Sequence, residues 1–242
     1  RNVPVRIRLG GYRWALIRRI LALGSTPFAI VAIDNVMIIA LNAVLQFYGG
    51  EALGDRLVTC ATIVQSFMLV VTMPLSGISC GTQTILAFNY GARRRDRILE
   101  AQKQIVRMCV GYVTVLFVLS RLAGPLFVRL FTAEPDLAAE AFAAIKVSTL
   151  AIIPLGVQYA LVDGFTGMGQ VRLSLPLSFW RKLVYFAALF LIPRVFPARA
   201  VFFVEPVSDV LGPLVTILVY RWTIGRVLDF EEDEADIERL PA

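Results

Sequence analysis

Long apolar stretches alternate with short polar or charged segments along most of the chain. Each stretch reaches or exceeds the about 20 residues that a helix needs to cross the hydrocarbon core of a bilayer. The strands of a membrane barrel would instead alternate in polarity over about ten residues, and no such alternation occurs. We predict an all-α, polytopic membrane helix bundle with six transmembrane spans, at about residues 20–47, 57–88, 104–131, 141–168, 173–196 and 200–222.

Two charged segments flank this predicted bundle at 20–222. Residues 1–19 contain six arginines, no acid and scattered apolar positions, which is typical of an interfacial helix or basic linker that leads into a membrane bundle. The chain therefore resembles part of a longer protein. Residues 223–242 form an acidic tail, with seven acids in 229–238. We expect the tail to be solvated, and the alternative is a docking segment.

Basic residues are distributed unequally between the connections that join the predicted spans. The connection 89–107 has six basic and two acidic residues, and 169–182 has three basic residues and no acid. The alternate connections have one arginine in 48–56 and none in 132–140. Because basic loops stay in the cytoplasm, we expect a multi-pass cell-membrane protein with both termini cytoplasmic. Its net charge of +6 then indicates contact with anionic lipid head groups in the bilayer and no nucleic acid.

The composition excludes several classes of protein. Hydrophobic residues make up 57% of the chain and charged residues 17%, against about 45–50% and 25% in soluble domains. Three cysteines and no histidine rule out a disulfide framework, histidine-based zinc sites and Ser-His-Asp catalysis. Phosphate-binding glycine loops are absent and no pairing of a nucleophile with a base stands out. We predict that the protein is not an enzyme and has no cofactor.

Four acidic residues fall inside the predicted spans. Each costs about 2.5–3.5 kcal/mol at the centre of a membrane helix, so each requires an internal hydrogen bond, a bound cation or a proton. Glu205 and Asp209 are one helical turn apart, so one of them is protonated or both share a cation. With their polar neighbours, the candidate cation- or substrate-binding residues are Asp34, Asn35, Asn42, Gln158, Tyr159, Asp163, Glu205 and Asp209.

Several prolines lie within the predicted spans or at their ends. Helix breaks in a membrane are tolerated where they line a cavity or allow bending. Bending helices and buried acids together favour a transporter. Because no nucleotide motif occurs, an ion gradient is the expected energy source.

A segment at the end of the second predicted span resembles a family motif. The sequence GISCGTQTILAFNYGA, residues 77–92, is followed by three arginines. It is similar to the span end of the multidrug and toxic compound extrusion (MATE) family, in its MepA-like branch, and departs from it at Thr84, where the family has proline. We expect Gly77 and Gly81 to permit close helix packing. The residues that carry the motif are Gly77, Gly81, Gln83, Asn89, Tyr90 and Gly91.

The resemblance implies a fold and a function. MATE transporters have twelve spans in two six-helix lobes, and this chain is similar to the second, C-terminal lobe, with a first lobe as its partner. The family exports small cationic, amphipathic compounds in exchange for H⁺ or Na⁺. The resemblance also implies Asp34 and Asp163 as residues of a cation site, with Na⁺ as a possible metal ion.

Two alternatives to an antiporter lobe stay open. One is an exporter of the same superfamily that resembles a lipid-linked oligosaccharide flippase, which should hold pyrophosphate with Arg or Lys inside the membrane. The acids in the spans argue against it. The other is a non-transporting membrane subunit or remnant.

Overall fold

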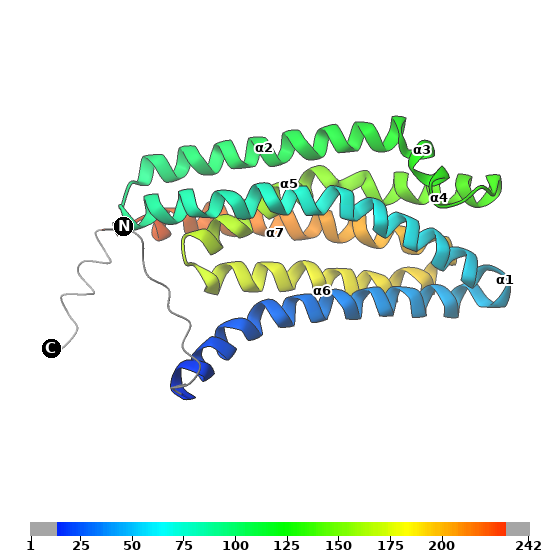
Figure 1. The fold of residues 1–242 in the computed structure, drawn as a ribbon, viewed down its shortest axis with the longest axis horizontal. Coiled ribbons are helices and arrows are strands. Elements are labelled where there is room, and N and C mark those ends of the chain that lie inside the picture. The colour runs from blue at the N-terminus through cyan, green and yellow to red at the C-terminus, as the bar shows by residue number, and fades with distance from the viewer. Residues whose placement is uncertain (1–13, 231–242) are drawn as a thin grey trace, which may run out of the picture. The chain divides into compact units, whose positions relative to one another are not determined.

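The computed structural model describes residues 14–230, which fold into helices and turns without a strand. The all-α prediction is confirmed. Two compact units divide between Ala43 and Val44, and the first consists, among the described residues, of the initial part of α1. The helices, drawn in Figure 1, are α1 (Trp14–Gly91), α2 (Arg95–Leu122), α3 (Gly124–Arg129), α4 (Pro135–Ser148), η1 (Thr149–Ala151), α5 (Ile152–Gly167), α6 (Val171–Val195), η2 (Ala198–Phe203) and α7 (Val204–Val227).

Within residues 14–230, six helical segments are long and apolar enough to cross a membrane. They are Ala32–Glu51, Leu53–Gly91, Arg95–Leu122, Pro135–Gly167, Val171–Val195 and Ala198–Val227. The predicted number of spans is therefore confirmed. Of the flanking segments, residues 1–13 of the predicted basic linker and 231–242 of the acidic tail lie outside the described residues.

The third span lies closer to the N-terminus than the predicted range 104–131. It begins at Arg95 because the buried positions Ile98, Gln102, Ile105 and Cys109 continue a helical face ahead of the apolar run. It ends at Leu122 because Gly124 and Pro125 start the separate short helix α3. Hydropathy locates the apolar run, whereas these two features locate the ends of the helix.

A sharp turn at Gly50 divides α1 into two membrane-length helices. Gly50 has φ 64° and ψ −170°, a backbone conformation that glycine adopts without steric cost. A Cβ atom on Gly49 would lie 2.7 Å from the Cα of Gly54, so the chain passes close to itself here. The three glycines therefore permit the reversal at the end of the bundle that also carries α3 (Figure 1).

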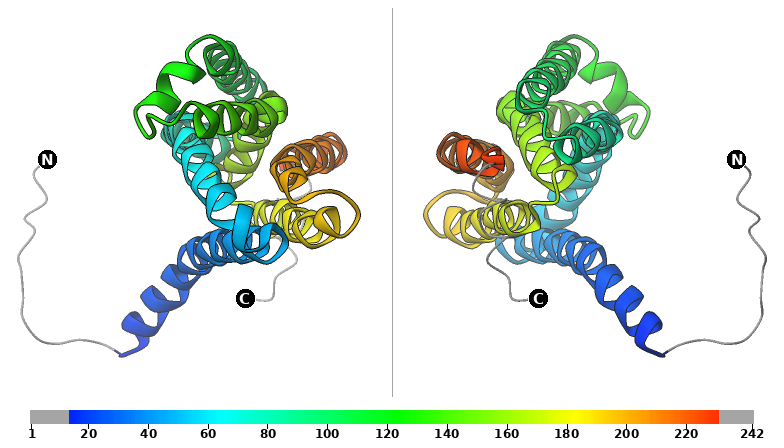
Figure 2. Two further views of the ribbon diagram at one scale, coloured as in Figure 1. Left: turned by 90° about the vertical axis from the view of Figure 1, so that its right-hand side faces the viewer. Right: turned by 90° about the vertical axis from the view of Figure 1, so that its left-hand side faces the viewer.

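The second unit, residues 44–230 as described, is a bundle in which α5 packs against both α2 and α7, and α6 packs against α7. Figure 2 shows these neighbours along the bundle. Fully buried Phe165, Leu155, Ile152, Val113 and Leu189 form part of its core. Helices approach closely at Gly156, where a Cβ atom would lie 2.8 Å from the Cγ2 of Val113.

The expected close packing at Gly77 and Gly81 does not occur within the described residues. A Cβ atom on either glycine would meet nothing within 4 Å, and both residues are exposed. The spacing alone could not show which face of the helix turns toward its neighbours. Close approaches between helices occur instead at glycines such as Gly156, Gly164 and Gly212.

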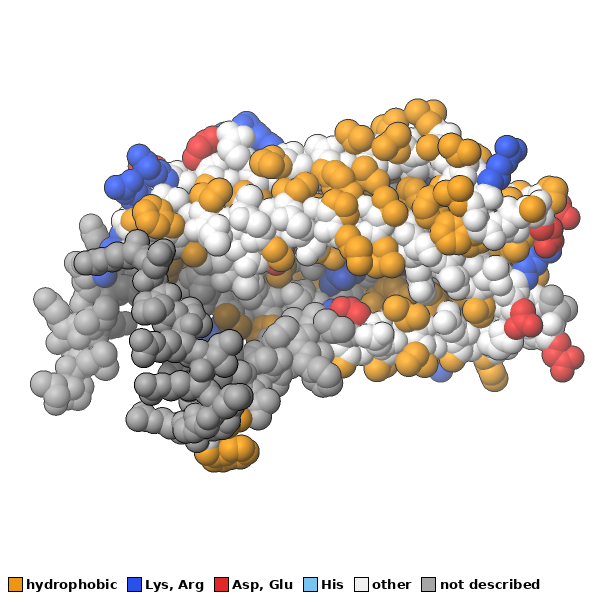
Figure 3. All heavy atoms as spheres, in the orientation of Figure 1, with side chains coloured by type: hydrophobic (Ala, Val, Ile, Leu, Met, Phe, Trp, Pro, Cys, Tyr) orange, Lys and Arg blue, Asp and Glu red, His pale blue; other side chains and the backbone are white. Residues whose placement is uncertain are grey.

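The surface of the bundle has the polarity of a membrane protein. Figure 3 shows hydrophobic side chains over its middle and charged side chains gathered mostly toward its two ends. Four exposed arginines lie at the start of α2 and in the turn before it: Arg93, Arg94, Arg95 and Arg97. We call this end of the bundle the basic end. The end that carries α3 and the turn at Gly50 is called the opposite end.

We predict that Gly156→Ala lowers the free energy of unfolding by about 1–3 kcal/mol, because the added methyl group overpacks the contact with Val113. The matched control Gly77→Ala has open space at its Cβ position and should gain about 0.5–1 kcal/mol from the better helix former. Thermal unfolding of both purified variants in detergent measures the difference. Equal effects would contradict the packing described here.

Candidate functional site

Asp163 lies on α5 and is held by the second helix of α1. Ser79 Oγ donates a hydrogen bond to Asp163 Oδ2, and the Cys80 thiol donates to the same oxygen at 3.6 Å. Ser79 is buried, Asp163 is half-buried and Cys80 is exposed. These three residues, the Asp163 group, connect segments that are more than eighty positions apart in the sequence.

The family motif surrounds the Asp163 group. Gln83 Nε2 donates to Cys80 Sγ at 3.8 Å. A Cβ atom on Gly167 would lie 2.9 Å from the carbonyl oxygen of Gln83, so the end of α5 lies directly against the motif helix. The motif therefore provides both the donors to Asp163 and the close helix contact beside it.

Asn89 and Tyr90 have structural contacts at the end of the motif helix. Asn89 Nδ2 donates to the carbonyl oxygen of Ile85 at 2.8 Å, one turn earlier. The Tyr90 hydroxyl accepts a hydrogen bond of 3.1 Å from Gln170 Nε2, in the connection between α5 and α6. Beyond Gly91, Arg93 adopts φ 53° and the chain turns into α2. These residues secure the turn at the basic end, and they do not bind Asp163.

A second charged group lies between α6 and α7. Asp209 is 1% exposed, and its Oδ1 accepts a hydrogen bond from Arg181 Nη1 at 3.3 Å. Ser208 Oγ lies 3.5 Å from the same oxygen. Asp209, which has no basic residue nearby on its own helix, is thus neutralised from the neighbouring helix.

This pairing changes the assignment of the basic residues in 169–182. The sequence predicts a basic connection at 169–182 that overlaps the predicted span 173–196, and Arg181 and Lys182 fall in both. In the structure they lie near the middle of α6, and Lys182 is 5% exposed. The connection consists only of the few residues between Gly167 and Val171. The membrane interior therefore contains bases as well as acids.

Two buried oxygens near this ion pair accept no hydrogen bond. They are Glu205 Oε2 and Gln158 Oε1. The Gln158 side chain donates weakly through Nε2 to the carbonyl oxygen of Leu177, at 3.5 Å. A Cβ atom on Gly212 would lie 2.7 Å from Gln158 Oε1 and 2.9 Å from Arg181 Cγ, so α5, α6 and α7 meet at this point. We call Gln158, Arg181, Glu205 and Asp209 the Glu205 cluster.

The remaining predicted residues lie elsewhere. Asp34, Asn35 and Asn42 are on α1 in the first unit, with Asp34 and Asn42 eight positions apart and so roughly on one helical face. Tyr159 is half-buried on α5, next to Gln158. Of the five candidates in the second unit, Asp163 lies in the Asp163 group near the basic end, and Gln158, Glu205 and Asp209 lie in the Glu205 cluster. Tyr159 belongs to neither group.

An ion-pair network at the opposite end was not predicted from the sequence. Glu140 contacts Arg56 at 2.9 Å and Arg199 at 2.8 Å, and Arg56 also contacts Glu134 at 3.1 Å. This Glu140 network connects the turn after Gly50, the start of α4 and η2. Each residue occupies an ordinary position in a polar connection, so the sequence carries no signal of the pairing.

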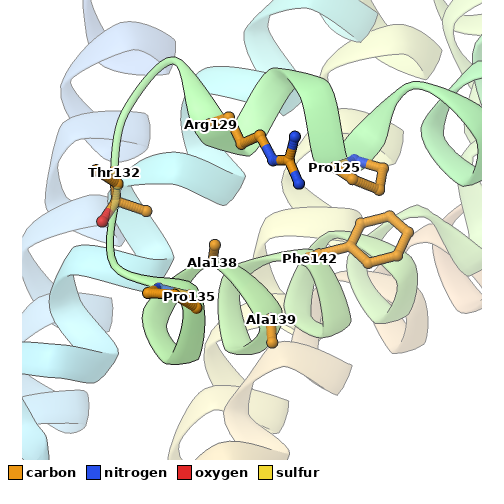
Figure 4. A pocket seen from close by; sticks show the side chains of 8 residues that line it. Pro125, Arg129, Thr132, Pro135, Ala138, Ala139 and Phe142 are labelled. Carbon is orange, nitrogen blue, oxygen red and sulfur yellow. The ribbon is translucent and has the colours of Figure 1, made fainter.

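Two cavities open beside this network. One, of about 930 Å³, is bordered by Arg56, Glu140, Arg199, Phe202 and Phe203. The other, of about 580 Å³, lies between α3 and α4. Figure 4 shows the side chain of Arg129 extending toward it from α3, with Phe142 on α4 opposite. Among residues 14–230 no three acidic or cysteine side chains gather in a way that could hold a metal ion.

Six membrane-length helices with charges paired between them define a polytopic α-helical membrane protein. The MatE family model matches residues 31–189, most of the chain. The chain belongs to the MatE family, as the motif indicated, and members of this family are transporters and not enzymes.

Curated relatives of the chain are multidrug export proteins. MepA of Staphylococcus aureus (strain MSSA476) is 22% identical over 223 residues, which cover 90% of this chain and 47% of MepA. MepA of Staphylococcus haemolyticus (strain JCSC1435) is 22% identical over 184 residues, 75% of this chain and 39% of that protein. The chain therefore spans less than half the length of these relatives.

Solved structures show the same fold. The inward-facing conformation of a multidrug resistance MATE family transporter has a TM-score of 0.79 and 16% identity, over 90% of this chain and 50% of that one. A MOP superfamily transporter from Pyrococcus furiosus, described as having a binding pocket of reverse polarity, has a TM-score of 0.78 and 17% identity, over 90% of this chain and 48% of that one. The chain thus has the fold of one lobe of these transporters.

We predict that Ser79→Ala lowers the free energy of unfolding by about 1–3 kcal/mol, because it removes a donor from a carboxylate inside the bundle. The matched control is Ser66→Ala. The Ser66 hydroxyl donates only within its own helix, to the Thr62 carbonyl oxygen, so this substitution should change the free energy of unfolding by less than about 0.5 kcal/mol. Thermal unfolding of the purified variants measures both. Equal changes in the free energy of unfolding for the two substitutions would show that the hydrogen bond from Ser79 to Asp163 does not stabilise the fold.

Proposed function

We propose that this chain is the C-terminal lobe of a secondary active antiporter that exports cationic, amphipathic compounds in exchange for H⁺ or Na⁺. The observation that carries the proposal is the Asp163 group. An acid held inside the membrane by the family's motif helix is a negative site that a coupling ion and an organic cation can occupy in turn. Competition for one negative site is what antiport requires.

The contacts of Asp163 suit an exchanging site. Its oxygen is held by one hydroxyl and one thiol, both neutral donors, and neither neutralises the charge. The exposed Cys80 and the open space at Gly77 and Gly81 lie on the same stretch of helix. That face is free for a substrate or for a first six-helix lobe, the partner that relatives about twice as long suggest.

The proposed setting is a cell membrane, crossed several times. Four exposed arginines lie at the basic end, whereas the two acids of the Glu140 network at the opposite end are paired with two arginines, so the bundle has an asymmetric charge. By the positive-inside rule we place the basic end, with both termini of the chain, in the cytoplasm. Asp34 is a further candidate for ion coupling, on the first helix.

One observation bears on the alternative of a flippase-like exporter of an anionic lipid-linked substrate. Such a protein needs bases inside the membrane, and Arg181 and Lys182 are there. Arg181, however, is paired with Asp209 at 3.3 Å, inside the lobe. This pairing supports a structural charge pair over an open basic surface, so the antiporter is the better-supported function.

The direct test is ethidium efflux from membrane vesicles that contain the chain alone or together with a first-lobe partner. We expect efflux driven by an imposed proton or sodium gradient, reduced to the level of empty vesicles by Asp163→Asn. The matched control Asp96→Asn changes an exposed acid at the start of α2 and should keep full efflux.

Each result of that test has a definite meaning. Efflux only with the partner assigns the chain to a transporter of two lobes. Folded protein that gives no gradient-driven efflux in either form contradicts the antiporter and favours a non-transporting subunit. Efflux that survives Asp163→Asn removes Asp163 from the coupling site.

We also predict that a charged, water-soluble thiol reagent modifies Cys80 and that ethidium slows the reaction, because Cys80 is exposed beside Asp163. Buried Cys60 and Cys109 should not react. Mass spectrometry of the labelled protein gives the modified position, with Cys80→Ser as the control. If only membrane-permeant reagents modify Cys80, the helix face that carries Cys80 contacts lipid, and this result would contradict the proposal.

A further inference from the structure

A proline lies inside the motif helix shortly before the Asp163 group. Pro74 precedes Ser79 by five residues on the second helix of α1. Because proline has no amide N–H, the carbonyl oxygen of Val70, four residues earlier, lacks the hydrogen bond that a helix normally gives it. Among the described residues of α1, the backbone angles are non-helical at Gly50 and helical at Pro74. An unpaired carbonyl oxygen inside a membrane is costly, so Val70 requires another donor.

The hydroxyl group of Tyr112 on α2 is that donor. Tyr112 Oη donates a hydrogen bond of 2.8 Å to the carbonyl oxygen of Val70, which is a normal length for such a bond. The ring of a proline crowds the carbonyl group four residues before it. The carbonyl group of Val70 therefore turns toward α2, where the side chain of the neighbouring helix replaces the missing N–H of Pro74.

Tyr112 lies on the part of α2 that packs tightly against α5. The next residue, Val113, is fully buried. A Cβ atom on Gly156 of α5 would lie 2.8 Å from Val113 Cγ2 and 3.3 Å from the carbonyl oxygen of Cys109. Because α5 also carries Asp163, Tyr112 and Asp163 belong to one tightly packed pair of helices.

This pair of helices holds the motif helix at two points, one on each side of Pro74. Tyr112 binds it at Val70, four residues before the proline, and Asp163 binds it at Ser79, five residues after the proline. Helices bend most readily at proline, where a backbone hydrogen bond is missing. The angle at Pro74 therefore decides whether a helix that is fixed at Val70 presents Ser79 to Asp163.

We propose that Tyr112 is a positioning residue of the Asp163 group: its hydroxyl replaces the amide N–H that Pro74 lacks, and so fixes the angle at which the motif helix brings its donors to Asp163. Without this hydroxyl, the carbonyl oxygen of Val70 loses its donor and the helix bends at Pro74. The donors then move away from Asp163. This inference rests on the proposed function of Asp163 and adds the residue that shapes its site.

The test measures how fast N-ethylmaleimide modifies Cys80 in the purified chain in lipid nanodiscs, by mass spectrometry, and it needs no transport. Tyr112→Phe removes only the hydroxyl group. We expect it to raise the rate about fivefold, the effect of one lost hydrogen bond on a local equilibrium, because the thiol is no longer held against Asp163. The matched control Tyr220→Phe keeps its ring contact with Phe165 and should leave the rate unchanged.

Pro74→Ala gives the decisive comparison, because it restores an amide N–H to the carbonyl oxygen of Val70. In this background, Tyr112→Phe should change the rate of Cys80 modification by less than about twofold. If Tyr112→Phe alone does not fold, the double variant should fold for the same reason, and a double variant that does not fold overturns the inference.

Cys60 and Cys109 separate positioning from general loss of stability. Both are buried and should stay unmodified in every variant. The inference is overturned if all three cysteines react faster in Tyr112→Phe, if Cys80 keeps its wild-type rate there, or if the increase is as large in the Pro74→Ala background. Gradient-driven efflux with an unchanged Cys80 rate leaves the proposed function standing. A Cys80 rate that depends on the hydroxyl, without efflux, contradicts only the proposed function.

Discussion

A charge inside the membrane must be neutralised within the protein, and this constraint organises the interior of the bundle. Asp209 would be costly on an isolated α7, and the guanidinium of Arg181 makes its position tolerable. Removing one partner of such a pair leaves an uncompensated buried charge, so the pair restricts how α6 and α7 can be placed against each other. Glu205, one helical turn from Asp209, differs from it because its buried oxygen Oε2 accepts no hydrogen bond.

The sequence was sufficient to predict the type and number of the membrane helices, because a span is a local property of about 20 residues. It also located Asp163 and Asp209 as acids that need partners. It could not supply the partners. Ser79 reaches Asp163 across 84 positions and Arg181 reaches Asp209 across 28, and no local pattern encodes which helices are neighbours.

Two further differences have physical causes. The charge count over 169–182 assigns Arg181 and Lys182 to a connection, although both also fall in the predicted span 173–196. Long side chains that are paired or partly buried are tolerated within α6. The spacing of Gly77 and Gly81 indicates a smooth helix face, but not what covers it. In both cases the sequence gives the chemistry of a residue correctly, and the packing decides its surroundings.

The polar contacts of the second unit lie at three levels along the bundle, and this arrangement bears on how a lobe can move. Near the basic end, Asp163 is bound to the motif helix. At the opposite end, Glu140 connects the turn after Gly50 with α4 and η2. Surface ion pairs contribute little singly, but a network that bridges three connections restricts each of them. A lobe held together at both ends is suited to moving as one body, and the pair of Arg181 and Asp209 joins α6 to α7 between those two ends.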